Sequence, residues 1–97
     1  MGRFRREGTF RDRGRFLAGV REQFDRLLGG AASGMSQTWE RRGEADVVRL
    51  SGFGVRVELV VEAARWTMEA EIPSWLPIPQ KAIEEKFDAK FSELAKL

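Results

Sequence analysis

The sequence of 97 residues contains no cysteine, no histidine and no tyrosine. The lack of cysteine excludes disulfide bonds, thiolate metal sites and cysteine nucleophiles, and it fits a reducing compartment. The lack of histidine removes the commonest general base near neutral pH and the commonest metal ligand. An enzyme of this composition would have to work with carboxylates, lysine, serine or threonine. We therefore predict a protein that is not an enzyme, with no catalytic residues, no cofactor and no metal site.

Long apolar runs are missing as well, since no segment approaches the roughly 20 apolar residues that a membrane-spanning helix needs. The N-terminus is basic, but no apolar signal-peptide core follows it. We expect a soluble protein that stays in the cytoplasm. A chain of this length can bury one modest core, so helices and strands must share a single domain, which we place at residues 9–97.

Positive charge is concentrated at the N-terminus, although the formal net charge of the whole chain is only +2. Residues 1–15 carry a net charge of +4, so the remaining residues sum to −2. Residues 1–8 also lack apolar periodicity, which predicts a flexible arginine-rich arm. Such an arm could contact the phosphates of a nucleic acid or a ribosome. The candidate polyanion contacts are Arg3, Arg5, Arg6, Arg11 and Arg13, with Phe4 and Phe10 interleaved for base stacking.

An alternating pattern over residues 55–63 and 65–72, in which Val60 is the one apolar residue on the otherwise polar side, predicts two strands, each with one apolar face. Two further strands are expected at residues 35–42 and 46–50, and glycines at the following turn favour a tight hairpin. In the strand at 46–50 the residues that we expect to point inward are Val48 and Leu50.

Apolar residues at helical spacing predict amphipathic helices near both ends of the chain, over residues 10–28 and from Gln80 onward. The resulting order is α-β-β-β-β-α. It predicts a two-layer α+β fold in which N- and C-terminal helices cover one face of a four-stranded antiparallel meander. An edge strand of so small a sheet also invites pairing with a second copy of the chain.

Four glutamates fall on the polar sides of the two alternating strands, namely Glu58, Glu62, Glu69 and Glu71. Paired carboxylates can act as acid and base when their environment separates their pKa values. A flat exposed sheet does not supply the burial that this needs, and Arg56 and Arg65 are available as cross-strand partners. We therefore predict a salt-bridged surface here.

The connection between the last strand and the last helix is unusually apolar, because prolines there are interspersed with Trp75, Leu76 and Ile78. These three residues are the candidate interaction surface, since an exposed apolar wedge can enter a partner or a hydrophobic particle surface. Alternatively, they fold under the sheet and close the end of the core. We favour burial, because an exposed patch of this kind promotes aggregation when no partner covers it.

Several short segments also follow one another in a distinctive order. They are Gln37–Glu40 around a tryptophan, residues 54–59, Met68–Pro73 followed by Trp75 and Leu76, and residues 81–94. In this order the chain, from about Phe24 to its end, resembles the bacterial family of polyhydroxyalkanoic acid system proteins, which are small granule-associated or accessory proteins.

The resemblance implies an accessory protein beside polyester storage metabolism, and it carries over no catalytic residue. We therefore expect a non-enzymatic accessory protein that acts by protein–protein or granule-surface contact. Two alternatives stay open. One is a nucleic-acid or ribosome-associated module that uses the basic arm, and the other is a carrier of a small apolar ligand with a pocket near Trp66 and Met68.

Overall fold

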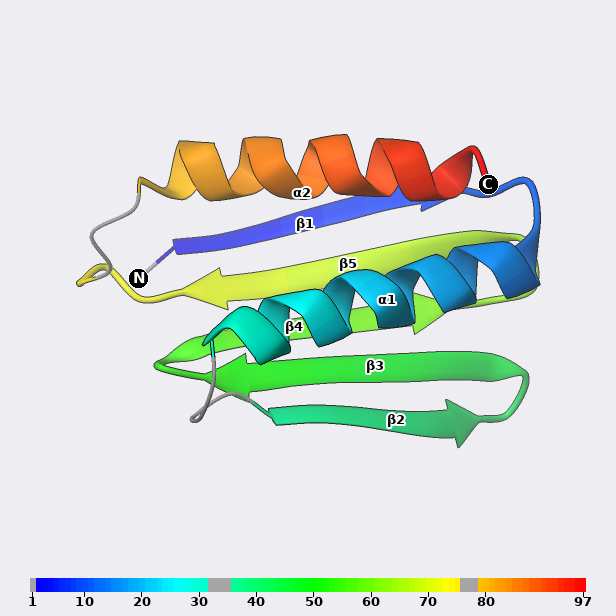
Figure 1. Ribbon diagram of the computed structural model, residues 1–97, viewed down its shortest axis with the longest axis horizontal. Coiled ribbons are helices and arrows are strands. Elements are labelled where there is room, and N and C mark those ends of the chain that lie inside the picture. The colour runs from blue at the N-terminus through cyan, green and yellow to red at the C-terminus, as the bar shows by residue number, and fades with distance from the viewer. Residues whose placement is uncertain (1, 32–35, 76–78) are drawn as a thin grey trace.

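One five-stranded antiparallel sheet and two helices make up the computed structural model, which describes residues 2–31, 36–75 and 79–97. The strands run in the spatial order β1-β5-β4-β3-β2 (Figure 1). In chain order the elements are β1 (Gly2–Thr9), α1 (Arg13–Ala31), β2 (Ser36–Arg42), β3 (Ala45–Gly52), β4 (Val55–Val61), β5 (Arg65–Ile72) and α2 (Gln80–Ala95).

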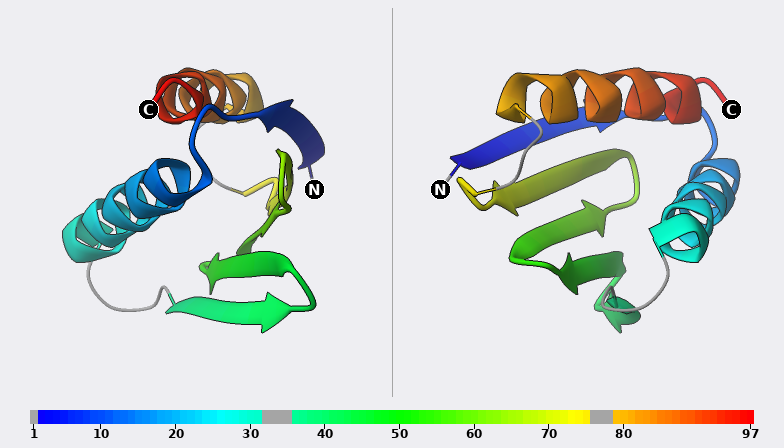
Figure 2. Two further views of the ribbon diagram at one scale, coloured as in Figure 1. Left: turned by 90° about the vertical axis from the view of Figure 1, so that its right-hand side faces the viewer. Right: turned by 60° about the vertical axis from the view of Figure 1, so that its left-hand side comes forward.

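The predicted α+β class is confirmed, and both helices lie on the same side of the sheet (Figure 2). The predicted meander is present as β2 to β5, in which each strand pairs with the next. Alternation places one set of side chains under the helices and the other set on the outer face. Val48 and Leu50 point inward as predicted and are buried in the core.

The expectation of a flexible arm at residues 1–8 is wrong for Gly2–Thr9, which form a strand on the open edge of β5. The register runs from Gly2 opposite Ile72 to Thr9 opposite Arg65, so the sheet has five strands where four were expected. Phe4 is 6% exposed and meets Phe87 of α2 edge-on at a ring distance of 5.9 Å. One apolar residue among arginines gives the sequence little strand pattern. The strand forms nevertheless, because the edge of β5 offers backbone hydrogen bonds and Phe4 is buried in the core.

The core fills the space between the inner sheet face and the helices. Helix α1 contributes Phe16, Val20 and Phe24, which recur every four residues along one face, and α2 contributes Phe91 and Leu94. The sheet contributes Phe4, Val48, Leu50, Val57, Leu59, Val61, Trp66, Met68, Ala70 and Ile72. At its centre the aromatic rings stack, with Trp66 at 4.5 Å from Phe91 and at 6.1 Å from Phe16.

Helix α1 begins three residues later than predicted because of Asp12. The Asp12 carboxylate accepts a hydrogen bond of 2.9 Å from the backbone N–H of Arg15, which satisfies one of the free donors at the helix start. The backbone of Arg11, just before this cap, donates to the carbonyl of Ala95 at 3.1 Å. The link between β1 and α1 is thereby attached to the end of α2.

The hairpin between β3 and β4 closes with only two residues, Phe53 and Gly54. Both have positive φ, 53° for Phe53 and 79° for Gly54, which is the pattern of a type I′ turn. Glycine adopts such a backbone readily, whereas a phenylalanine is unfavourable there. The turn predicted from its glycines is present, and Phe53 occupies its strained position.

We expect Phe4→Ala to lower the free energy of unfolding by about 3 kcal/mol, because it leaves a cavity between β1 and α2. Urea denaturation measures the change. As a control, Arg5→Ala on the outer face of the same strand should change stability by less than about 0.5 kcal/mol. Equal stability of Phe4→Ala and the parent protein would show that β1 is not part of the folded core.

We expect Phe53→Asn to raise the free energy of unfolding by about 1 kcal/mol, because Asn-Gly suits both positions of a type I′ turn. Phe53→Val, which puts a β-branched side chain at positive φ, should lower it. Thermal and urea denaturation of the two variants test the pair. A stability loss in Phe53→Asn would contradict the assigned turn.

Candidate interaction surface

Two aromatic side chains project together from one end of the sheet. Phe53 is 54% exposed and Trp75 is 65% exposed. A methyl group placed on Gly54 would lie 3.4 Å from Trp75 Cζ2 and 3.2 Å from Pro73 Cγ, so the segment after β5 packs against the β3–β4 turn. We call Phe53, Gly54, Pro73 and Trp75 the aromatic tip. The β3–β4 turn and the start of the β5–α2 connection both lie at the left end of the molecule in Figure 1.

The sequence left two alternatives for Trp75, burial under the sheet or exposure at an interaction surface, and the structure shows it exposed. Burial under the sheet was favoured and is wrong for this residue, which is among the most exposed apolar side chains of the described residues. Leu76 and Ile78, the other members of the candidate surface, lie outside the described residues. Phe53 was missed. Its signal was a phenylalanine preceding Gly54 in a two-residue turn, where asparagine or glycine is usual.

The arginines of the basic N-terminus are largely engaged in ion pairs. Arg6 faces α2, where its Nη2 donates to Glu84 at 2.6 Å and its Nε donates to Asp88 at 2.9 Å. These hydrogen bonds, first to Asp88 and then to Glu84, raise the pKa of Arg6 above its ordinary value. Arg3 hydrogen-bonds to Glu71 on β5.

Of the remaining polyanion candidates, Arg13 and Arg5 lie near carboxylates and Arg11 does not. Arg13 Nη2 donates to Asp46 Oδ2 at 2.7 Å and to the carbonyls of Val61 and Glu44. Arg5 lies 3.7 Å from Glu7. Arg11, in the link between β1 and α1, makes no ion pair within the described residues. Of the six arginines in residues 1–15, Arg3, Arg6 and Arg13 thus pair with carboxylates that are distant in sequence.

The outer sheet face is a network of arginines and glutamates. Arg49 bridges two strands, since its Nε donates to Glu58 at 2.9 Å and its Nη1 donates to Glu40 at 2.7 Å. These contacts agree with the predicted salt-bridged surface, although Glu58 is paired by Arg49 and Glu71 by Arg3. A shallow depression of about 550 Å³ lies over this network. Its paired carboxylates do not resemble an acid/base site.

The hydrogen bonds of this network shift two carboxyl groups in the same direction. The hydrogen bond from Arg49, supported by its charge and by Arg42, lowers the pKa of Glu40. The hydrogen bond and charge of Arg3 lower the pKa of Glu71. Both carboxylates are therefore easier to ionise in the folded chain than in the unfolded one.

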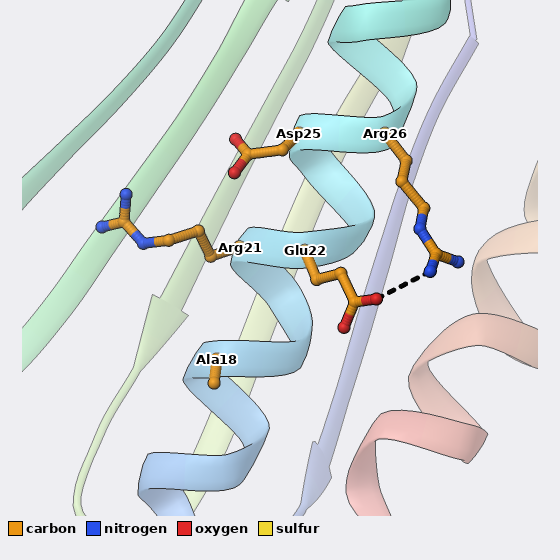
Figure 3. A pocket seen from close by; sticks show the side chains of 5 residues that line it. All are labelled: Ala18, Arg21, Glu22, Asp25 and Arg26. Atoms are coloured by element: carbon orange, nitrogen blue, oxygen red, sulfur yellow. Dashed lines mark hydrogen bonds and ion pairs between the residues drawn. The ribbon is translucent and has the colours of Figure 1, made fainter.

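A second depression of about 510 Å³ lies on the outward side of α1 among Ala18, Arg21, Glu22, Asp25 and Arg26 (Figure 3). Its charged groups already have partners. Glu22 accepts from Arg26 at 2.7 Å along the helix. The Arg21 guanidinium lies 4.2 Å from the ring centre of Trp39, and Asp25 accepts from Gln37 at 3.1 Å. Arg21 and Asp25 thereby fasten α1 to β2.

Of the two residues predicted to line a carrier pocket, Met68 is fully buried, and Trp66 is 6% exposed with its indole between the rings of Phe16 and Phe91. Trp66 also lines a depression of about 300 Å³ between β1 and α2, together with Gly8 and Asp88. Within residues 2–31, 36–75 and 79–97 no group of three or more carboxylate, histidine or cysteine side chains could hold a metal ion. Over the same residues, neither helix combines the length and the apolar character that crossing a bilayer requires.

Comparison with known proteins adds little to this geometry. No protein-family model matches the chain, and no curated protein matches it. Among solved structures, the crystal structure of Ara h 8.0201 is similar with a TM-score of 0.46 and 13% sequence identity, over 97% of this chain and 94% of that chain. A likeness at this level says nothing about function.

We expect the double variant Glu40→Gln/Glu71→Gln to flatten the acid limb of the stability curve. Because the pKa of each group is lowered on folding, its contribution is present above the unfolded value of about 4.3 and is lost as pH falls through the folded value. Urea midpoints from about pH 6 to about pH 3 should fall less steeply in the double variant. Glu85→Gln is the matched control and should keep the parent slope.

Proposed function

We propose that this protein is a non-enzymatic accessory protein that acts by surface contact, and that the aromatic tip is the contact. The observation that carries the proposal is the exposure of Trp75 and Phe53 at one place, where Phe53 lies in a two-residue turn and Trp75 lies beside Gly54 of the same turn. Side chains this large are normally buried in the core or covered by a partner.

The surface that the tip contacts is, in this proposal, a polyhydroxyalkanoate granule or a protein on it, in the cytoplasm of a bacterium. The support is the resemblance in segment order to polyhydroxyalkanoic acid system proteins. The matched segments lie in β2, β4 and β5. In the sheet β4 and β5 pair directly, and β3 lies between β4 and β2. The β5–α2 connection, which contains Trp75, is also among the matched segments.

The two alternatives have weaker support. A polyanion contact would draw on Arg3, Arg5, Arg6, Arg11 and Arg13. All of these except Arg11 are already hydrogen-bonded or close to carboxylates. A small apolar ligand could reach Trp66 only from the depression of about 300 Å³ between β1 and α2, and contact with the fully buried Met68 would require displacing stacked aromatic rings. Pairing with a second copy through an edge strand stays a prediction, and β2 with Glu40, Arg41 and Arg42 carries the charges that commonly discourage it.

Co-sedimentation with isolated polyhydroxyalkanoate granules tests the proposal. The parent protein should sediment with the granules, and Trp75→Ser should reduce the bound fraction by about tenfold, since an interfacial tryptophan contributes more than 1 kcal/mol of apolar burial. The control is Leu97→Ser, which removes an apolar side chain that is 45% exposed at the C-terminus. Parent protein that stays in the supernatant, or equal sedimentation of both variants, would refute granule contact through the tip.

A further inference from the structure

We propose that the aromatic tip docks on an anionic lipid–water interface, with Phe53 and Trp75 entering the headgroup region. The inference rests on the proposed function, because it specifies the chemistry of the surface that the same tip contacts. Four features of the tip support it: its composition, its shape, its charge and its cost to the fold.

The composition of the tip suits an interface between water and hydrocarbon. Three large apolar side chains of the described residues are strongly exposed, namely Phe53, Trp75 and Leu97, and two of them are in the tip. A tryptophan combines an apolar body with an N–H donor, and such rings gather where one end of the side chain is wet and the other dry. Phe53 supplies a purely apolar ring beside it.

The shape of the tip favours a deformable surface over a folded partner. A two-residue turn and the start of a connecting segment form a small projection at the end of the sheet (Figure 1). Two side chains bury far less than the roughly 1,200–2,000 Å² of a stable protein interface. A layer of amphiphiles closes around a projecting ring, so a small tip can be fully desolvated there. The tip is also ordered beforehand, because Trp75 packs on Gly54.

The charge around the tip complements an anionic surface. Arg56 follows the turn by two residues. It is exposed and makes no ion pair within the described residues. Arg3 lies in the same row across the sheet as Arg56, with Glu71 between them. Cations next to interfacial aromatic residues strengthen adsorption to anionic headgroups.

The cost of Phe53 to the fold gives the experiment its sharpest variant. Its backbone has φ of 53°, which disfavours phenylalanine, and its ring is largely in water. Phe53 is thus unfavourable for the backbone of the turn, and its apolar ring is exposed to water. In this proposal a contact with a surface outside the molecule accounts for both. Phe53→Asn removes that ring and suits the turn, so loss of binding in this variant cannot be attributed to unfolding.

The test uses the full chain with vesicles of equal parts phosphatidylglycerol and phosphatidylcholine. The parent protein should co-sediment with them, and Phe53→Asn and Trp75→Ser should each weaken the apparent affinity by about tenfold. Leu97→Ser should bind like the parent. Acyl chains brominated near the headgroup should quench the fluorescence of Trp75. The quenching should be absent in Trp75→Ser, because Trp66 is enclosed in the core and Trp39 is half-buried in the middle of β2, opposite Val48.

The electrostatic part has its own matched pair. Arg56→Gln should weaken binding to the anionic vesicles and leave weak binding to pure phosphatidylcholine unchanged. Arg11→Gln makes the same change in net charge in the link between β1 and α1, far from the tip, and should have a smaller effect. Raising the salt concentration should reduce the difference between the two variants.

Three outcomes would overturn the inference. They are no binding to anionic vesicles, binding that Phe53→Asn and Trp75→Ser leave unchanged, and self-association of the parent protein that both variants abolish, which would make a second copy the occupant. Lipid-free poly(3-hydroxybutyrate) particles separate this inference from the proposed function. Binding to the particles that depends on Trp75, without binding to vesicles, leaves granule contact standing and rejects the lipid interface. Binding to vesicles without binding to the particles supports the lipid interface and rejects contact with the polyester.

Discussion

The pairing of β1 with β5 is the interaction on which the rest of the structure depends. It supplies the strand beneath α2, since Phe4 of β1 meets Phe87, and Arg6 of β1 hydrogen-bonds to Glu84 and Asp88. It also closes the core over Trp66, because a methyl group on Gly8 would lie 3.0 Å from the Trp66 ring. Without β1, α2 would lose its contacts with Phe4 and Arg6, and β5 would have an open edge.

The same pairing changes what the N-terminal charge means. In the sequence, the arginines before residue 15 form a local excess of positive charge. In the fold Arg3 pairs with Glu71 of β5, Arg6 with Glu84 and Asp88 of α2, and Arg13 with Asp46 of β3. Three of the six arginines are therefore balanced by carboxylates that are far away in the sequence. Charge asymmetry along a sequence indicates a polyanion-binding tail only when the tail has no folded partner of opposite charge.

Strong periodicity explains which parts of the fold could be predicted. The alternation from Val55 to Ile72 determined two strands and their buried faces, and the helical spacing of Phe87 and Phe91 determined α2. Strand β1 escaped because its one buried apolar residue lies among arginines whose partners are 68 to 82 positions away in the chain. Pairings at that separation leave no local pattern to detect.

The candidate site was predicted less well than the fold for a related reason. General physical expectation favours burying Trp75 and placing a small or polar residue at Phe53, and both expectations follow rules that serve stability. The chain departs from both rules at one place, while its core, its first helix cap and its sheet register obey them. When two residues that lie side by side both depart from the rules for stability, a functional requirement on that surface is the expected cause. The aromatic tip combines Phe53 on a strained two-residue turn with Trp75 on the neighbouring segment after β5, and Arg56 follows the turn. In the proposed role this tip enters another surface, and its function then depends on what that surface contains.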